Sequence, residues 1–381
     1  MIITEGKKKI LFVIDTLQLG GAEQSLLANT SRFVNTDSVI CHLYPGEALK
    51  PKFIEHGKKV YSLNIKKKYG FVKAYQQLKK IVQDEKPDLI VAYLTRSEII
   101  ARLVARFNHV PVIGTFVNDL YTPSYNQHLS WKARKLVNVF KTLNKYTSKH
   151  CIGFVANSRA IKEANAIHLN IPPAKIEVIN RGRDSFKIKR RGEGNLPENR
   201  SINFVNVSRL FTVKGHRQLI QGFKMFVDQH PDATLTIVGD GPLKEELSEL
   251  IVSTKLDNKV TLLGARKDVP EILADYDCFV FPSIMEGFSG ALVEALFAQL
   301  PILATNIPQN QEIVTHLRTG YVFGTESAEE IFKAMIWYKN NMQLAHQLAA
   351  NGYAYAITNF ELDNIVNQFE NYLHLKIAGK Q

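Results

Sequence analysis

The segment EGFSGALVE, residues 286–294, constrains the fold of this chain more than any other stretch. It follows an apolar run at 278–283 that is typical of a buried strand, and it continues into a pattern typical of an amphipathic helix. A strand that turns through glycine into a helix leaves first-turn backbone N–H groups free above the carboxyl end of the strand. Ser289 can cap such a helix, so the amides of the three residues after it become candidate ligands for diphosphate oxygens. The segment therefore predicts an anion site at the end of a strand.

Two carboxylates flank this turn. Glu286 lies before it and Glu294 lies roughly one turn inside the predicted helix, so both can approach one ligand from opposite sides. Carboxylates accept hydrogen bonds from hydroxyls, which suits a sugar and a ribose. The alternative is that Glu286 is an ordinary loop carboxylate and Glu294 a solvated helix residue, because short motif matches carry a false-positive risk.

Two more strand-to-loop junctions in the same half of the chain are built to meet a ligand. The turn VGDGP, with Gly239 and Gly241, ends an apolar strand at 234–240, and Arg209 and Lys214 follow another at 201–207. Ligands of open parallel sheets bind at the carboxyl ends of strands, so the three junctions should converge. An arginine offers a planar fork for phosphate oxygens and a lysine a compact charge. Either cation alone could also be an ordinary surface residue.

Together these motifs resemble those of the retaining GT-B glycosyltransferases of family 4, and the likeness covers nearly the whole chain. It includes GGAE at 20–23, VANS at 155–158, INRGRD at 179–184, SRL and KG within 208–215, VGDGP at 238–242, LLGARKDVPEILADYDCFVFPS at 262–283 and EGFSGALVEAL at 286–296. The resemblance implies an α/β fold of two doubly wound Rossmann-like domains facing a central cleft. It also implies transfer of a sugar from a nucleotide-sugar donor to a glycan or lipid-linked acceptor, with the anomeric configuration kept and with no metal or other cofactor.

The resemblance assigns roles to individual residues. Arg209 and Lys214 would bind the donor diphosphate and Glu286 the transferred sugar, and these three form the catalytic set because fixed charges must replace a metal. Glu294 would bind the ribose hydroxyls. The other donor-binding positions implied are Gly20, Gly21, Asn118, Gly239, Gly241, Arg266, Gly287, Phe288, Ser289, Gly290 and Ala291. The base, which contacts mainly backbone around 264–268, stays open between uridine, guanosine and adenosine.

One departure from the family pattern concerns the loop after a strand of the first domain. Many relatives have a histidine there, where this chain has Asn118 and Asp119 within PVIGTFVNDLY. An asparagine can donate a hydrogen bond to a sugar hydroxyl, but it cannot exchange protons near neutral pH. A plain turn at the end of a strand is the alternative interpretation of both residues.

Alternating strand and helix patterns predict two doubly wound parallel sheets. The predicted strands lie at 9–15, 38–44, 88–94, 111–116, 151–157 and 176–180 in the first half, and at 202–208, 234–240, 259–264, 278–283 and 301–305 in the second. The predicted helices include 21–33, 71–85, 216–230 and 243–254, and a long helical pattern runs from 327 onward. We expect a first, acceptor-side domain at 1–183, a polar linker at 184–200, a nucleotide-sugar-binding domain at 201–360 and a last helix at 361–381 that crosses back to the first domain. A chain of 381 residues with 45% apolar residues is large enough to bury two cores.

The net positive charge of the chain comes entirely from its first half. Residues 1–190 hold 32 Lys and Arg against 14 Asp and Glu, which gives +18, while the remainder carries −6. Such asymmetry indicates an acidic partner, and we expect the first domain to dock on anionic lipid headgroups near a lipid-linked acceptor. The segment HLSWKARKLVNVFKTLNKY combines basic residues with apolar ones at helical spacing. Its alternative interpretation is a core helix with a solvated basic face.

Other features limit the remaining function classes. Cys41, Cys151 and Cys278 lack metal-type spacing, which predicts buried free thiols in a reducing compartment. The start of the chain does not read as a secretory leader, and no apolar stretch approaches a membrane span, so we expect a cytoplasmic protein that is soluble or peripheral on the inner membrane face. A UDP-sugar epimerase of GT-B fold, or a non-catalytic protein that binds nucleotide sugars or polyanions, is the alternative function. Nucleic-acid binding is not expected, because the basic clusters lack interleaved aromatic residues.

Overall fold

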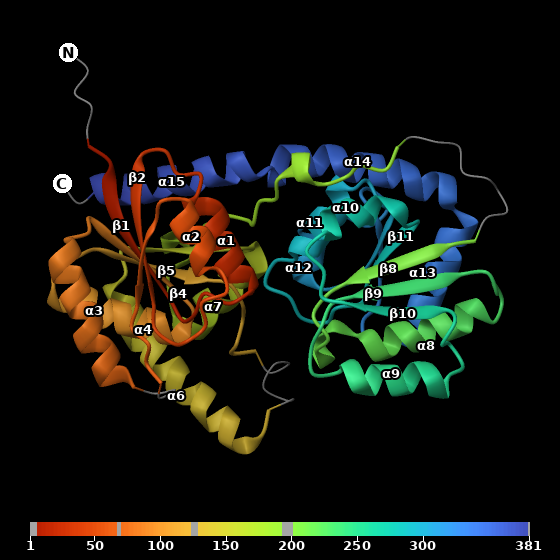
Figure 1. Cartoon of the computed structure of the whole chain (residues 1–381), viewed down its shortest axis with the longest axis horizontal. Coiled ribbons are helices and arrows are strands. Elements are labelled where there is room, and N and C mark those ends of the chain that lie inside the picture. Colours follow the sequence, from red (N-terminus) through yellow and green to blue (C-terminus); the bar gives the residue numbers. More distant parts are fainter. Residues whose placement is uncertain (1–5, 67–69, 123–128, 193–200, 380–381) are drawn as a thin grey trace, which may run out of the picture. The chain divides into compact units, whose positions relative to one another are not determined.

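The computed structural model describes residues 6–66, 70–122, 129–192 and 201–379, and it divides into two compact units. Unit 1 comprises residues 1–182 together with 362–381, and unit 2 comprises residues 183–361. Each unit is a parallel sheet with helices on both faces (Figure 1). The predicted fold class, two doubly wound α/β domains, is confirmed.

The part of unit 1 that the structure describes contains a seven-stranded sheet in the order β3-β2-β1-β4-β5-β6-β7. The strands are β1 (Lys8–Ile14), β2 (Thr36–His42), β3 (Lys59–Ser62), β4 (Leu89–Tyr93), β5 (Val112–Phe116), β6 (Gly153–Ala156) and β7 (Ile176–Val178). Along β1, Phe12 and Ile14 enter one core cluster and Leu11 and Val13 enter the other. Because both faces of the sheet are buried, such strands read as continuous apolar runs.

The helices of unit 1 cover the two faces of its sheet. One face packs against α1 (Gly21–Thr30), α2 (Lys50–Glu55) and α15 (Leu362–Ala378), and the other against α3 (Phe71–Glu85), α4 (Thr95–Phe107) and α7 (Arg159–Leu169). The helix α6 (Trp131–Thr147) lies against α4 and α7. The end of the chain is fastened by Glu370, whose carboxylate accepts hydrogen bonds from the backbone N–H of Asn35 at 2.8 Å and from the hydroxyl of Thr36 at 2.7 Å.

Unit 2 has a parallel sheet in the order β10-β9-β8-β11-β12-β13. Its strands are β8 (Asn203–Val207), β9 (Thr234–Val238), β10 (Val260–Gly264), β11 (Cys278–Phe281), β12 (Ile302–Thr305) and β13 (Tyr321–Phe323). One face of the sheet packs against α8 (His216–Val227), α9 (Lys244–Ser253) and α13 (Ala328–Asn340). The other face packs against α10 (Val269–Ile272), α11 (Gly290–Phe297) and α14 (Met342–Phe360). The short helix α12 (Pro308–Gln311) follows β12. The chain order reverses between β8 and β11, which is the point where such sheets bind ligands.

Three details differ from the sequence pattern. The edge strands β3 and β13 were not predicted, because three or four residues at a sheet edge produce little periodicity. Of the expected linker, residues 193–200 lie outside the described residues, and residues 184–192 belong to unit 2, where Arg191 pairs with the buried Asp277 at 2.7 Å. The long C-terminal helical pattern divides into α13, α14 and α15. None of the helices described is long and apolar enough to cross a bilayer.

Candidate active site

The three predicted junctions of unit 2 lie at the carboxyl ends of the neighbouring strands β9, β8 and β11. Gly239 follows β9, Arg209 follows β8 and the segment 286–294 follows β11. Since β8 pairs with both of the other strands, the sheet brings these loops to one edge. The convergence expected from the sequence is thus a property of the strand order.

The helix α11 begins as its sequence predicts. Gly290 is its first residue, and the hydroxyl of Ser289 accepts a hydrogen bond from the backbone N–H of Leu292 at 3.3 Å. Phe288 is buried in the core beneath this turn and packs edge-on against Phe360, with the ring centres 5.4 Å apart. The turn is therefore held from below, while Gly290 and Ala291 stay only half-buried at the start of the helix.

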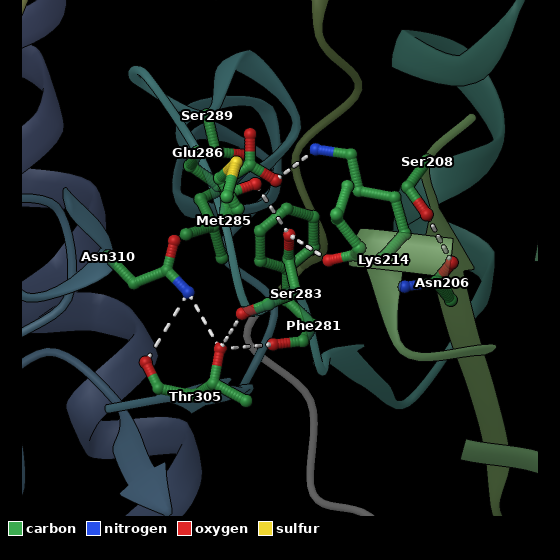
Figure 2. Close-up of polar contacts among 12 residues, drawn as sticks. Asn206, Ser208, Lys214, Phe281, Ser283, Met285, Glu286, Ser289, Thr305 and Asn310 are labelled. Carbon is green, nitrogen blue, oxygen red and sulfur yellow. Dashed lines mark hydrogen bonds and ion pairs between the residues drawn. The ribbon is translucent and has the colours of Figure 1, made fainter. Parts of the chain in front are cut away.

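Lys214 and Glu286 form an ion pair across two loops. The Lys214 Nζ lies 2.5 Å from the Glu286 Oε1, and the two side chains are 13% and 10% exposed (Figure 2). Lys214 ends a short 3-10 turn, Thr212–Lys214, that precedes α8, and Glu286 follows β11. Two of the three residues predicted to be catalytic are thus brought together although they are 72 positions apart in the chain.

Buried hydrogen bonds fix the loop that carries Glu286. The hydroxyl of Ser283 lies 3.1 Å from the Met285 carbonyl oxygen and 3.3 Å from that of Val213, which joins this loop to the one that carries Lys214. Thr305 donates to the Ser283 carbonyl and accepts from the Asn310 side-chain amide at 2.9 Å (Figure 2). Every hydroxyl here has a partner, so the network holds its shape without a ligand.

Glycines allow the neighbouring loops to approach closely. Gly215 has a φ of +72°, and a Cβ there would collide with the Pro282 carbonyl oxygen. Gly239 has a φ of +151°, and a Cβ would collide with the Ser208 carbonyl oxygen, while at Gly241 it would lie 2.6 Å from that of Leu210. The missing side chains of Gly239 and Gly241 therefore make room for the loop that carries Arg209.

A histidine that the sequence analysis did not single out supports this loop. The Nε2 of His216, at the start of α8, lies 2.9 Å from the Ser208 hydroxyl, which in turn lies 3.0 Å from the Asn206 Oδ1. Burial lowers the pKa of His216 to about 4, and the nearby charge of Lys214 acts in the same direction. The imidazole is therefore neutral at pH 7 and acts as a hydrogen-bonding group.

Arg209 and Arg266 are both exposed, but only Arg209 follows one of the three converging strands. Arg266 follows β10 and lines an open pocket with Asn203 and Thr234, which begin β8 and β9. The Arg209 guanidinium stacks over the Phe211 ring, 5.1 Å from its centre. Arg266 pairs with Asp268, with Nε 2.7 Å from Oδ1, and this hydrogen bond lowers the pKa of the Asp268 carboxyl. Both cations are thus held by local contacts, and Arg209 is exposed at the edge where the loops converge.

Glu294 has a partner that the sequence analysis did not predict. Its Oε1 lies 2.6 Å from the Nε of Arg183, and a Cβ at Gly290 would collide with the same guanidinium. Arg183 belongs to the INRGRD segment, so the motif was visible but its contact was not. The carboxylate expected to bind a ribose is therefore ion-paired in this structure.

The remaining predicted residues belong to unit 1. Gly20 caps the start of α1, where the Glu23 carboxylate folds back against it, and a Cβ at Gly21 would lie 2.8 Å from the Arg181 Nη1. Burial raises the pKa of Glu23. The glycine loop thus has a carboxylate and a guanidinium beside it, and Arg181 is a second cation of the INRGRD segment that the sequence analysis left without a role.

Asn118 and Asp119 have different environments. Asn118 lines a cavity of about 280 Å³ at the carboxyl ends of β1, β4 and β5, together with Asp15, Arg96 and side chains of α6. The Asp119 Oδ1 accepts a hydrogen bond from the backbone N–H of Tyr121 at 3.0 Å, which is the geometry of an Asx turn. Asp119 is therefore a turn residue, and Asn118 is the one of the two that faces a cavity.

Two family models match nearly all of the chain. The model described as Glycosyltransferase Family 4 matches residues 20–185, and the model described as Glycosyl transferases group 1 matches residues 187–355. Among curated proteins, the chain is 28% identical over 275 residues to the UDP-Gal:alpha-D-GlcNAc-diphosphoundecaprenol alpha-1,3-galactosyltransferase of Escherichia coli, covering 70% of each chain. It is 27% identical to an uncharacterized glycosyltransferase of Methanocaldococcus jannaschii, covering 62% of this chain and 60% of that protein.

Solved structures share the fold over almost the whole length. The complex of Anabaena HepE with UDP matches with a TM-score of 0.81 at 22% identity, covering 96% of this chain and 99% of that one. The sucrose-phosphate synthase of Thermosynechococcus elongatus matches with a TM-score of 0.80 at 14% identity, covering 98% and 100%. The two family models and the shared architecture agree with the strand order and loops described above. The chain belongs to glycosyltransferase family 4 and has the GT-B fold of that family.

Proposed function

We propose that this protein is a retaining, metal-independent glycosyltransferase that moves a sugar from a UDP-sugar to a lipid-linked or glycan acceptor in the biosynthesis of a cell-surface polysaccharide. The observation that carries the proposal is the grouping of Arg209, the Lys214–Glu286 pair and the start of α11 at the carboxyl ends of adjacent strands. Cations and helix amides suit a diphosphate, and a carboxylate beside them suits a sugar hydroxyl.

The proposed reaction is a front-face displacement. The acceptor hydroxyl oxygen forms a bond to the anomeric carbon as the bond from that carbon to the diphosphate oxygen breaks on the same face. The hydroxyl proton passes to the leaving phosphate oxygen. Arg209, Lys214 and the first amides of α11 hold the charge that develops on the diphosphate, which is the task a divalent metal performs in other enzymes. Glu286 orients the sugar.

UDP is the preferred donor nucleotide for two reasons. The Escherichia coli relative is named for a UDP-Gal donor, and the Anabaena HepE structure holds UDP. These two proteins are 28% and 22% identical to this chain. The name of the Escherichia coli relative also specifies an acceptor on diphosphoundecaprenol. An N-acetylgalactosaminyltransferase of Campylobacter jejuni, which is 28% identical and is covered over 60% of its length, is named for an acceptor on the same lipid carrier.

We propose that unit 1 receives this acceptor and contacts the membrane surface. The cavity beside Asn118 lies where parallel sheets bind ligands, between the ends of β1 and β4. The neighbouring helix α6 has no acidic residue, and its apolar Val139 and Leu143 are 55% and 40% exposed. A basic helix with apolar residues facing solvent is typical of interfacial helices and less so of core helices.

Binding and product analysis test the donor assignment. Thermal unfolding should shift upward with UDP or a UDP-sugar and not with GDP or ADP, because a ligand at 100 times its dissociation constant stabilises by roughly 2.7 kcal/mol. The coupling constant of the anomeric proton in the product should equal that of the donor, and EDTA should leave turnover unchanged. A product with inverted configuration, or activity that requires a divalent metal, would contradict the mechanism.

A vesicle assay tests the membrane contact. The protein should sediment with vesicles that contain phosphatidylglycerol at low salt and remain in the supernatant with phosphatidylcholine alone. Val139→Ser together with Leu143→Ser should weaken sedimentation, whereas Val72→Ser, which changes an exposed apolar residue of α3, should not. If the wild type and both variants sediment equally, α6 does not contact the membrane.

A further inference from the structure

Arg183 is anchored to unit 2 by both its backbone and its side chain. Its backbone N–H donates to the Phe360 carbonyl at 3.0 Å, and its Nε lies 2.6 Å from the Glu294 Oε1. The side chains of Arg183 and Glu294 are 24% and 18% exposed, so the pair is largely shielded but reachable from solvent. A guanidinium in this position can exchange its carboxylate for another anion without exposing a buried charge.

The guanidinium lies directly over the first residue of α11. A Cβ at Gly290 would collide with it, so the absence of a side chain at that position makes room for Arg183. The N-terminus of a helix carries a partial positive charge, which favours anions and disfavours a cation placed beside it. The Glu294 carboxylate, one turn further along α11, offsets this repulsion. A diphosphate at the same place would offset it more fully, because it carries more negative charge and can contact the helix amides as well.

We propose that Arg183 is a third diphosphate-binding cation of the donor site, coupled to Glu294 by partner exchange. Without nucleotide, Glu294 binds the guanidinium of Arg183. When the donor binds, the ribose hydroxyls take over Glu294, and Arg183 turns to the diphosphate oxygens beside Gly290. This inference rests on the proposed donor site and adds a residue to it.

The exchange predicts different effects of one substitution on the binding of two probes, UDP and uridine. Arg183→Gln removes a charged hydrogen bond to phosphate, so UDP should bind about 10- to 100-fold more weakly. Uridine has the ribose but no phosphate, and its competitor for Glu294 is gone, so its affinity should stay equal or increase. Arg183→Lys keeps the charge but loses the planar fork, so its UDP affinity should lie between those of the wild type and Arg183→Gln.

Titration calorimetry at low salt, with uridine measured in competition with UDP, decides between this and two other roles. An equal loss of affinity for UDP and uridine would mean that Arg183 only holds Glu294 in place for the ribose. Tighter binding of both probes would mean that Arg183 only blocks the site. Either result would overturn the proposal.

The controls separate this inference from the proposed function and from misfolding. Lys333→Gln removes an exposed cation of unit 2 that pairs with Glu329 and Glu330 on α13, and it should leave both affinities unchanged. The unfolding temperatures of Arg183→Gln and Arg183→Lys should lie within a few degrees of that of the wild type, which shows that both variants fold. If the wild-type protein binds none of UDP, GDP and ADP, the proposed function and this inference both fail. If it binds UDP and Arg183→Gln binds UDP equally well, only the inference fails.

Discussion

Removal of Lys214 tests whether its ion pair with Glu286 serves catalysis or only stability. The pair joins two loops over 2.5 Å, and both side chains are at most 13% exposed. In Lys214→Ala the Glu286 carboxylate remains in a shielded place without its cation. The double variant Lys214→Ala with Glu286→Gln removes both charges and leaves a neutral amide in that place.

The two variants should separate stability from turnover. Breaking a buried pair by removing one partner costs 3–5 kcal/mol and exposed pairs contribute 0–1 kcal/mol, so for this partly shielded pair we expect a loss of about 2 kcal/mol in the free energy of unfolding. The double variant should recover most of this loss, because no unpaired charge remains. Turnover should behave differently. Loss of one fixed group that stabilises the charge on the leaving diphosphate costs about 3–4 kcal/mol in the transition state, which lowers kcat on the order of 100-fold or more. The double variant should not recover this loss of kcat.

Denaturant unfolding measures the first quantity, and release of UDP during sugar transfer measures the second. Lys333→Ala, which removes an exposed paired lysine of the same unit, is the matched control and should alter neither. If Lys214→Ala turns over at a near-normal rate, or if the double variant regains the wild-type kcat, then Lys214 is a structural residue and the assignment of the diphosphate site is wrong.

Three further outcomes are expected. Burial lowers the pKa of His216 from 6.5 to about 4, so on acidification the unfolded chain binds a proton at this histidine before the folded chain does. The free energy of unfolding should therefore be highest above pH 6.5 and should decline by about 3 kcal/mol as the pH falls to 4. His216→Asn should flatten this part of a plot of unfolding free energy against pH. Gly239→Ala should lower both the unfolding temperature and UDP affinity, because its Cβ meets the Ser208 carbonyl and the loop that carries Arg209 must shift; unchanged values would show that the loop adapts freely. Arg102→Met should destabilise unit 1 by about 3–5 kcal/mol at pH 8, because Glu98, 2.6 Å away, loses the cation that favours its charged form. Burial already raises the pKa of Glu98 to about 7, so its carboxyl must then bind a proton to remain in the core, and Glu98→Gln in the same chain should restore part of that loss in urea unfolding.

Local sequence patterns were sufficient to predict the fold class and the start of the helix α11 in the candidate site. The strand runs and their helices follow from hydrophobic periodicity, and the helix at 71–85 has the bounds that its pattern indicates. The cap at Ser289 follows from the preference of serine for that position, and the structure shows its hydrogen bond. The short edge strand β3 was missed because its four residues are partly exposed and contain no apolar run. The same reason explains the correct and the missed predictions: a segment that is largely buried must be apolar at regular spacing, and a segment that is largely exposed need not be.

The partners of the charged residues could not be predicted in this way. Lys214 and Glu286 are 72 positions apart, and Arg183 and Glu294 are 111 positions apart, so their meeting depends on which strands lie side by side. A parallel α/β architecture, the turns that end its strands and the residue types available to a diphosphate follow from the amino-acid sequence alone, because a few adjacent residues are enough to specify each of them. Three further facts depend on how distant segments pack together: Glu294 is held by Arg183, His216 is buried and neutral, and Gly239 makes room for a neighbouring loop. Those facts depend on sheet order and packing distances, which no local pattern of residues contains.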